Sequence, residues 1–504
     1  MSFNSYLFIF VYLPLIVIGY YLIKRWNRDD ITKGFLLLVS SFFYAYAGVR
    51  AFATVIILTL FTYLIVHFGY KLKQKKLFLI VGIIANILAL FYFKYLIFTE
   101  ITINKFLGTR LSVVNFVLPL GISFITFSQI SFLVDSYRGE IEGKVSLIEY
   151  ALYILFFPKV TMGPIALSKT FIKELNEAVS RKTDFEKITL GFIAFTFGLS
   201  KKVLLADVLC KIADWGFENN YLLGTFNALI VILAYTCQIY FDFSGFSDMA
   251  YGICMMLNID LPVNFNSPYR ALSVVDFWDR WHITLTKFFT KYIYIPLGGS
   301  RKGNIRTYVN IMIVFLISGL WHGSAVTFII WGLMHGIGNS VSRYIDNLEK
   351  TRGLDYKKKN YPVLSKVVRY AVTFLFINVS WVYFRALTVG EGNQMLVELF
   401  SFKFRLPDLK LIAAATPKEL EIIQWIFVTF FKDLNLNVYF GNIIIILLIT
   451  FAVFASTCMK NTQERIAYIK TNGIKKSMIA IVVILFVFCV ISLSEVSSFI
   501  YVNF

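Results

Sequence analysis

Three of the four histidines of the 504-residue chain lie close together in sequence. They are His282, His322 and His335, and all fall within residues 240–338, where polar side chains interrupt an otherwise apolar sequence. The imidazole pKa lies near neutral pH, so histidine is the side chain best suited to take a proton from a hydroxyl group. The spacing of the three residues therefore directs the search for a catalytic base to this stretch.

His322 is the first candidate for that base. It lies in the sequence GLWHG, at the end of an apolar run that begins near Tyr308. At about 1.5 Å per helical residue, this places His322 at or beyond the middle of a membrane span. An ionisable group at that depth is costly unless it has a partner or a function. The alternative is a structural histidine that hydrogen-bonds between helices.

His282 lies in the sequence DFWDRWHITL. Phe277, Trp281 and Leu285 recur at nearly helical spacing, which predicts an amphipathic helix on the cytoplasmic side. The functional interpretation of His282 is binding or orientation of the reacting group. The alternative is an interfacial helix whose charges are paired and solvated, and these charges belong to Asp276, Asp279 and Arg280.

His335 lies in the sequence WGLMHGIG, among Gly332, Gly336 and Gly338. Small residues at this spacing are typical of closely packed membrane helices. We therefore expect His335 to be a packing residue.

A glycine-rich basic loop occupies residues 296–303, with the sequence PLGGSRKG. Backbone amides and cations in such a loop can meet phosphate groups, so a donor-binding role for Arg301 is one interpretation. The loop matches neither a Walker nor a Rossmann pattern, and a tight basic turn is the alternative.

The sequence FDFSGFSDMAYG, at residues 241–252, places carboxylates beside an apolar run. Asp242 and Asp248 are candidate site residues because intramembrane carboxylates are usually functional. Ser244 lacks the strand-turn-helix setting of a hydrolase nucleophile, so we expect it and Ser247 to line a pore or to form structural hydrogen bonds. With four histidines and no paired cysteines, no metal site is predicted.

The composition is that of a membrane protein. Hydrophobic residues make up 58% of the chain and charged residues 16%, against about 25% charged in soluble domains. The net charge of +19 arises from Lys and Arg clusters between apolar runs, which is the pattern of cytoplasmic loops rather than of nucleic-acid binding. The five cysteines are scattered and indicate no disulfide framework.

The apolar runs must position the candidate residues. The basic segments after the first and third runs predict an outside N-terminus, inside loops around residues 135–144 and 169–187, and an outside loop at 387–433. Residues 148–165 are apolar but flanked by inside loops, and Pro158, Gly163 and Pro164 predict a broken, re-entrant segment. The expected spans are 6–23, 34–47, 51–70, 77–98, 116–134, 188–199, 222–240, 308–320, 326–341, 367–384, 441–459 and 477–493.

Taken together, these stretches resemble the membrane-bound O-acyltransferase (MBOAT) superfamily, and most of all its alginate O-acetyltransferase type. The similarity covers nearly the whole chain, although Lys159 and Ser318 differ from the residues usual at these positions of the family's motifs. It rests on LPLGISFITFSQ, FFPKVTMGPI, FGLSKKVLLAD, YFDFSGFSDMA, NFNSPYRA, DFWDRWHITL, YIYIPLGGSRKG, RTYVN, GLWHG, WGLMHG, WVYFRA and FIYVNF.

The resemblance implies an all-α, polytopic membrane fold, a ring of about 11–13 transmembrane helices with re-entrant segments around a central tunnel. It implies a single domain over residues 1–504, made of N-terminal helices (1–145), a catalytic core (146–345) and C-terminal helices (346–504). The family's active-site histidine falls on His322 and its second histidine on His282. Donor or substrate binding is assigned to Asp242, Ser244, Asn266, Arg280, Trp281, Arg301 and Trp321.

The function implied is O-acylation in a bacterial cell membrane. Acetyl-CoA would arrive from the cytoplasm as acyl donor, with no bound cofactor. The acetyl group would pass to an extracytoplasmic polysaccharide such as alginate, peptidoglycan or cellulose. A secreted, esterase-like partner of the SGNH type would assist, and the remaining contacts would be with membrane lipids and not with nucleic acid.

Three alternatives remain open at this point. The D-alanyl transfer branch, which serves teichoic acids, shares several of the same motifs. A transporter for a polymer or lipid-linked sugar would also place charged residues at depth. A non-catalytic scaffold for secreted acetylation enzymes is the third.

Overall fold

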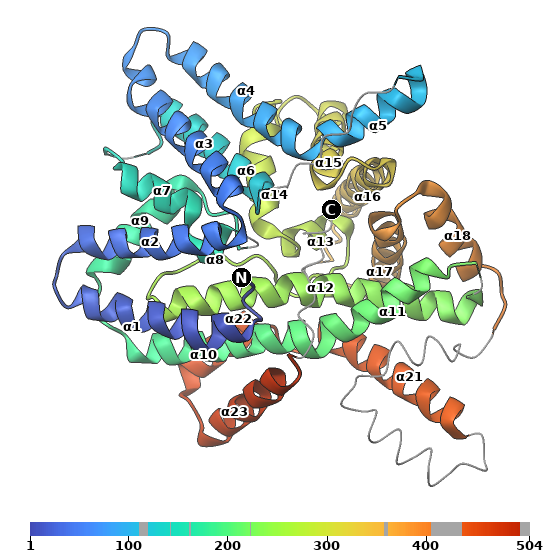
Figure 1. Ribbon diagram of the computed structural model, residues 1–504. Coiled ribbons are helices and arrows are strands. Elements are labelled where there is room, and N and C mark those ends of the chain that lie inside the picture. Colours follow the sequence, from blue (N-terminus) through green and yellow to red (C-terminus); the bar gives the residue numbers. More distant parts are fainter. Residues whose placement is uncertain are drawn as a thin grey trace. The chain divides into compact units, whose positions relative to one another are not determined.

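The computed structural model describes residues 1–109, 119–141, 143–160, 163–221, 223–356, 361–404 and 436–493. Within these ranges the chain forms helices joined by turns and contains no β-strand, so the all-α prediction is confirmed (Figure 1). Most of the predicted outside loop and the C-terminal FIYVNF fall beyond the described ranges.

The chain forms two compact units, whose boundaries fall inside two long helices and in the Val263–Asn264 link. They do not follow the predicted subdivision at residues 145 and 345, which stays a prediction. Unit 1 comprises Met1–Phe197 and Phe246–Val263, and unit 2 comprises Gly198–Gly245 and Asn264–Phe504. Unit 1 contains η1 (Phe8–Tyr12), α1 (Leu13–Lys24), α2 (Asp29–Ala47), α3 (Val49–His67), η2 (Gly69–Lys71), α4 (Lys75–Lys94), α5 (Leu96–Leu107), α6 (Ile122–Tyr137), α7 (Leu147–Leu155), α8 (Phe157–Val160), α9 (Ser168–Ser180) and most of α10 (Phe185–Ser200).

Unit 2 holds the remaining elements, apart from the C-terminal end of α12, which belongs to unit 1. These are η3 (Lys201–Ala206), α11 (Asp207–Glu218), α12 (Gly224–Met256), η4 (Pro268–Arg270), α13 (Val274–Arg280), α14 (Ile283–Phe289), η5 (Thr290–Tyr294), α15 (Asn304–His322), α16 (Val326–Thr351), α17 (Val363–Arg385), α18 (Val389–Leu399), α21 (Leu436–Thr457), α22 (Thr462–Asn472) and α23 (Lys476–Ile491).

Six helices in the described ranges are long and apolar enough to cross a membrane, or seven if the bent pair Asn442–Thr457 and Thr462–Asn472 is one span. Two shorter apolar helices, Phe8–Lys24 and Lys476–Ile491, coincide with the predicted first and last spans. The runs at 34–47 and 326–341 lie in α2 and α16. These two helices carry charged residues at one end and are not among the six that are long and apolar enough to cross a membrane. The chain is therefore a polytopic membrane protein whose apolar runs differ in length.

The predicted break in residues 148–165 is present in unit 1. Helix α7 ends at Leu155, Phe156 adopts a non-helical conformation, and α8 is a single short turn that includes Pro158. Together with α2 and α9, these helices form one packed group (Figure 1). Lys159 of α8 is 4% exposed, and its ammonium lies 3.8 Å from the ring centre of Tyr153, so a cation–π contact compensates for part of its burial.

Polar contacts in unit 1 join the basic segments that sequence places inside. The Lys24 ammonium donates to the carbonyl of Ala178 at 2.8 Å, at the end of α9. The Ser180 hydroxyl donates to Asp29 at 2.8 Å, and Lys33 forms an ion pair of 2.8 Å with Glu149 at the start of α7. The α1–α2 connection, the end of α9 and the start of α7 thus lie on one side of unit 1. The assignment of this side to the cytoplasm stays a prediction.

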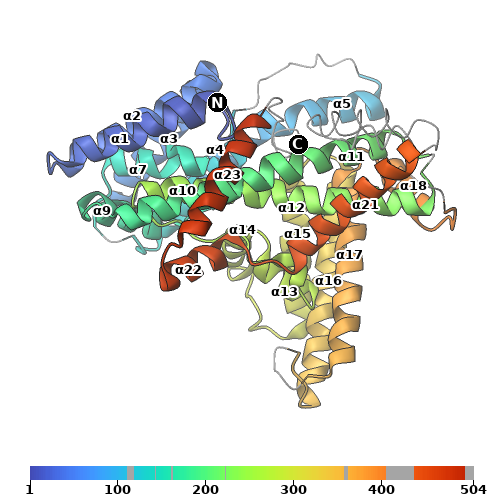
Figure 2. The same cartoon turned by 90° about the horizontal axis from the view of Figure 1, so that it is seen from below.

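Unit 2 places α15, α16 and α17 side by side (Figure 2). Gly319 of α15 faces the Phe328 carbonyl, and Gly332 of α16 faces the Phe315 carbonyl, so a side chain at either glycine would collide with backbone. This close approach is the reason for the small residues seen in the sequence. It sets the distance between the helix that carries His322 and the helix that carries His335.

Candidate active site

His322 is the last residue of α15. Gly323 follows in an extended conformation, and a side chain at this glycine would overlap the ring of Phe328. The imidazole is 4% exposed, and its ring centre lies 4.7 Å from that of Trp321 and 5.0 Å from those of Trp331 and Phe384. His322 is therefore held at a helix end among aromatic rings, where little bulk water can reach it.

His335 is fixed by hydrogen bonds at both ring nitrogens. Trp278 donates its indole N–H to His335 Nδ1 at 3.1 Å, and His335 Nε2 lies 3.0 Å from the hydroxyl of Ser380. The indole can only donate, so Nδ1 must be the acceptor and Nε2–H the donor. The ring is fully buried. This geometry agrees with the predicted packing role, because neither nitrogen is left for proton transfer.

His282 interrupts the segment that was predicted to be one amphipathic helix. Helix α13 ends at Arg280, α14 begins at Ile283, and His282 adopts left-handed φ/ψ angles of 44° and 50°. The prediction of a continuous helix was wrong because near-helical spacing of Phe277, Trp281 and Leu285 cannot reveal a single left-handed residue. Such strained residues concentrate at functional sites.

A hydrogen bond sets the tautomer of His282. Its Nδ1 lies 3.1 Å from Asn264 Oδ1, which also accepts from the hydroxyl of Thr284 at 2.9 Å and from the Thr284 backbone amide at 3.3 Å. The amide oxygen is thus the acceptor, and Nδ1 carries the proton. In a neutral ring Nε2 is then the basic nitrogen, because the hydrogen bond that one ring nitrogen donates fixes the proton there.

Aromatic rings connect the surroundings of His282 and His322 within unit 2. The His282 ring packs on Phe243 at 4.8 Å, and Phe243 packs on Phe265 at 4.9 Å. Trp281 then contacts Phe265 and Trp381, both at 5.0 Å, and Phe384 joins Trp381 to His322. Trp281 is 1% exposed, so the tryptophan assigned to donor binding is a core residue of this aromatic wall.

Asn266 and Arg280 hold the loop before α13. Arg280 pairs with Asp276 at 2.9 Å, and its backbone carbonyl accepts from the amide of Asn266 at 2.9 Å. The Asn266 side-chain oxygen accepts from Asn461 at 3.2 Å. Both residues were assigned to donor or substrate binding. In the structure they make the contacts that place His282, which supports a positioning role.

Asp242 forms part of an ion triad with the buried Lys202 and the partly exposed Asp207, which was not predicted from the sequence. Lys202, which is 2% exposed, lies 2.8 Å from Asp242 and 2.8 Å from Asp207. Lys202 belongs to η3, a π-helical turn between α10 and α11, and Asp242 lies on α12. Such turns are frequent at functional sites. Ser244 nearby is 1% exposed, and its hydroxyl makes no hydrogen bond within the described ranges.

Two cavities run along α15 and share Val275 and Arg343 as lining residues. The first, called the outer cavity, has a volume of about 350 Å³ and polar walls that include Ser300 of the basic loop, the cations Arg343 and Lys350, and the carboxylates Asp346 and Asp355. The second, called the inner cavity, has a volume of about 140 Å³, is mainly apolar and reaches Ser318, one helical turn before His322. Helices α13 and α14, on either side of His282, contribute Trp278 and Leu285 to its wall.

The glycine-rich loop lies at the first cavity. Asn310 of α15 donates to the Gly299 carbonyl at 2.9 Å, and Gly298, Gly299 and Gly303 all have positive φ, as a tight turn requires. Arg301 and Lys302 are exposed. Within the described ranges no group of His, Cys, Asp and Glu could hold a metal ion, so nothing in that part of the chain offers a metal centre.

Comparison with known proteins places this site in a family. The model of the family described as "MBOAT, membrane-bound O-acyltransferase family" matches residues 42–385. A peptidoglycan O-acetyltransferase of Helicobacter pylori is 37% identical over 78% of this chain and 79% of its own length. A probable alginate O-acetylase of Pseudomonas syringae is 36% identical over 80% and 76%, respectively. A teichoic acid D-alanyltransferase of Bacillus subtilis is 26% identical over 72% and 92%. The chain belongs to the membrane-bound O-acyltransferase family.

Proposed function

We propose that this O-acyltransferase moves acetyl groups from cytoplasmic acetyl-CoA to a hydroxyl group outside the cytoplasm, with His322 as general base. The observation that carries the proposal is the pair of cavities along α15, which share Val275 and Arg343 in their walls. One borders the basic loop and the other reaches Ser318, one helical turn before His322. A donor with a polyanionic head and a long apolar arm matches this order of a polar and then an apolar cavity.

The charges along the path support a CoA donor. The lining of the outer cavity contains two cations, Arg343 and Lys350, and two carboxylates, Asp346 and Asp355. Asp346 is paired with Arg369 at 2.9 Å, and the exposed Arg301 and Lys302 on the loop beside the cavity add positive charge. Arg343 donates from Nε to Asn339 Oδ1 at 3.0 Å, which holds the guanidinium in place on the wall that the two cavities share. Cations there would bind the phosphates of CoA, and the apolar walls of the inner cavity would surround the arm that carries the thioester.

The chemistry at His322 follows from its setting. Its unprotonated nitrogen takes the proton from the acceptor hydroxyl as the hydroxyl oxygen attacks the thioester carbonyl. The tetrahedral intermediate then collapses, the C–S bond breaks, and the CoA thiolate leaves with the proton that the imidazolium returns. The aromatic rings around His322 exclude water, which protects the thioester from hydrolysis.

His282 has a supporting role in this proposal. The bond from Nδ1 to Asn264 leaves Nε2 as the basic atom, and His282 lies at the turn between the two helices that line the inner cavity. A histidine held in this way can orient a reacting group or a water molecule by accepting a hydrogen bond. Trp321, which packs on the His322 ring and is 6% exposed, fixes the orientation of the base.

The acceptor proposed is a cell-surface glycan. The relatives at 36–37% identity are named for O-acetylation of peptidoglycan and alginate, whereas the teichoic acid D-alanyltransferase is 26% identical, which favours acetyl over D-alanyl transfer. A secreted, esterase-like partner of the SGNH type would take the acetyl group from the outer end of the path. Loss of acetylation in cells that lack such a partner, with transferase levels unchanged, would support this step; unchanged acetylation would exclude it.

Closing the inner cavity tests the donor path. Ser318 is 2% exposed and lines this cavity, so Ser318→Trp should fill it and lower kcat/KM for acetyl-CoA on the order of 100-fold, as displacement of a bound substrate does. Ile317→Trp is the matched control, because Ile317 is 36% exposed and does not line the cavity. Release of CoA by purified protein given acceptor is the measurement. A folded Ser318→Trp protein as active as the Ile317→Trp protein would contradict the path.

A further inference from the structure

Unit 1 contains a cavity of about 730 Å³ that the transfer reaction does not use. It is bounded by the end of α1, the α1–α2 connection and the α9–α10 connection. Part of its wall is apolar and open: Ile18 is 59% exposed, Leu22 52% and Phe185 77%. Large apolar side chains exposed to this degree on a membrane protein are positions for acyl chains.

The rest of the wall is basic. Lys24, Arg25 and Lys182 line the cavity and form no ion pair with the described residues, while Asp29 is the one carboxylate in the lining. The Lys24 ammonium is fixed by the Ala178 carbonyl, and the side-chain ends of Arg25 and Lys182 are exposed. The cavity thus presents three cations against one anion.

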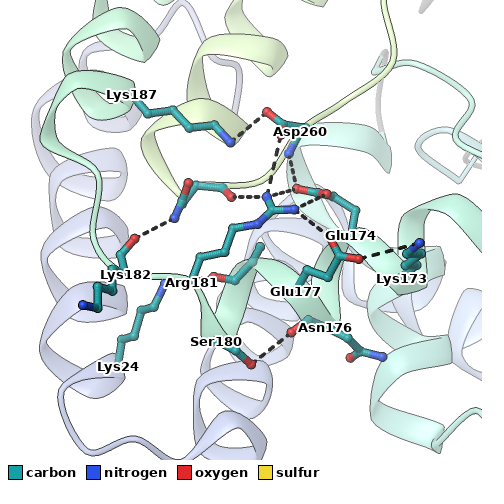
Figure 3. Close-up of polar contacts among 12 residues, drawn as sticks. Lys24, Lys173, Glu174, Asn176, Glu177, Ser180, Arg181, Lys182, Lys187 and Asp260 are labelled. Carbon is teal, nitrogen blue, oxygen red and sulfur yellow. Dashed lines mark hydrogen bonds and ion pairs between the residues drawn. The ribbon is translucent and has the colours of Figure 1, made fainter.

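Arg181, also in the lining, has its positive charge balanced by neighbouring carboxylates. Figure 3 shows its guanidinium directed at Glu174 and Glu177, with ion pairs of 2.6 and 2.8 Å, and at Asp260, which in turn pairs with Lys187 at 2.8 Å. The hydrogen bonds to Glu174 are the main cause of the raised pKa of Arg181, so it stays charged. This network fixes the α9–α10 connection to residue 260 and so holds the neighbouring Lys182 backbone at the cavity.

We propose that this cavity binds one anionic phospholipid of the cytoplasmic leaflet, with its phosphate among Lys24, Arg25 and Lys182 and an acyl chain along Ile18, Leu22 and Phe185. The basic segments lie where sequence places the cytoplasmic face, and this is the leaflet surface at which polybasic segments attract anionic headgroups. A free phosphate would satisfy the cations but would leave the adjoining apolar wall uncovered. An amphiphile matches both.

The test uses the full-length protein in nanodiscs that contain phosphatidylglycerol and phosphatidylcholine, followed by native mass spectrometry of retained lipid. Arg25→Gln with Lys182→Gln should weaken retention of one phosphatidylglycerol by roughly 10- to 30-fold, given the contribution of each basic residue to headgroup attraction. These two side chains make no hydrogen bond within the described ranges, so the variant should fold. Lys73→Gln with Lys75→Gln is the matched control, with the same charge change on the same predicted membrane side and outside the cavity lining.

The expected result is one phosphatidylglycerol retained by the unmodified protein and by the control, and lost from the cavity variant. Equal retention in all three proteins would overturn the proposal. So would equal retention of phosphatidylcholine, which would indicate unspecific annular lipid. Displacement of the lipid by glycerol 3-phosphate at matched ionic strength would assign the cations to a soluble phosphate and would also overturn it.

Discussion

Replacing His322 by alanine should lower the rate of acetyl transfer by about 10²- to 10⁴-fold, which is the usual contribution of a general base. The loss should appear in kcat and leave KM for acetyl-CoA nearly unchanged, because His322 lies one turn beyond the cavity residues proposed to bind the donor. His322→Gln, which keeps a polar side chain of similar length but no basic nitrogen, should be equally impaired. The measurement is release of CoA by purified protein in the presence of acceptor.

The matched control is His67→Ala, since His67 lies in α3 of unit 1, stacks on Tyr63 and lines neither of the two cavities along α15. It should keep full activity. A purified, folded His322→Ala protein with the activity of the His67→Ala protein would remove His322 from the mechanism. A fall in both variants with loss of protein would indicate instability rather than chemistry, and the His322→Gln protein then decides between the two.

The second large effect is expected at the ion triad of Lys202, Asp207 and Asp242. Lys202→Met should leave the buried carboxylate of Asp242 uncompensated and lower the free energy of unfolding by about 3–5 kcal/mol, as removal of one partner of a buried ion pair does. Because η3 and α12 are joined through this pair, the loss should loosen both elements. Thermal unfolding of the purified protein in detergent, followed by tryptophan fluorescence, measures the change.

Two further variants distinguish the effect of breaking the Lys202–Asp242 ion pair on stability from the effect of removing any lysine. Lys201→Met removes the neighbouring, less buried cation and should cost little. The double variant Lys202→Met with Asp242→Leu removes both buried charges and should be more stable than Lys202→Met alone. A Lys202→Met protein as stable as the Lys201→Met protein would show that the triad does not hold the fold.

The sequence was sufficient to predict the helical membrane class, because apolar runs and basic loops report bilayer geometry directly. The interruption near Pro158 was also predictable, since proline cannot continue a helix interior. The polar block around Asp242 was expected beside a span, whereas the structure places it inside α12, a helix of 33 residues. The length of this helix was underestimated because hydropathy ends a predicted span at the first carboxylate. Asp242 is nevertheless buried inside the helix, because it is paired with Lys202, a partner that hydropathy does not show.

The role of a site residue could be predicted only where it depends on neighbours in the sequence. His335 was predicted to be a packing residue from its glycine neighbours, and its two hydrogen bonds agree with that role. The left-handed turn at His282 and its bond to Asn264 join residues 18 positions apart and left no periodic signal. The pairing of Lys202 with Asp242 was missed for the same reason, although a lysine and an aspartate that each follow directly after a predicted apolar span are a signal that could have indicated it.

The central claim is acyl transfer through the membrane with His322 as the base, and inside-out vesicles test it most directly. Vesicles from cells that carry the natural acceptor and any partner would receive radiolabelled acetyl-CoA on the outside, which is the former cytoplasmic face. The account predicts ester-linked label on glycan inside the vesicles and an equal amount of free CoA outside, both absent with His322→Ala protein. Vesicles with the unmodified protein that accumulate no more internal label than the His322→Ala vesicles would contradict it.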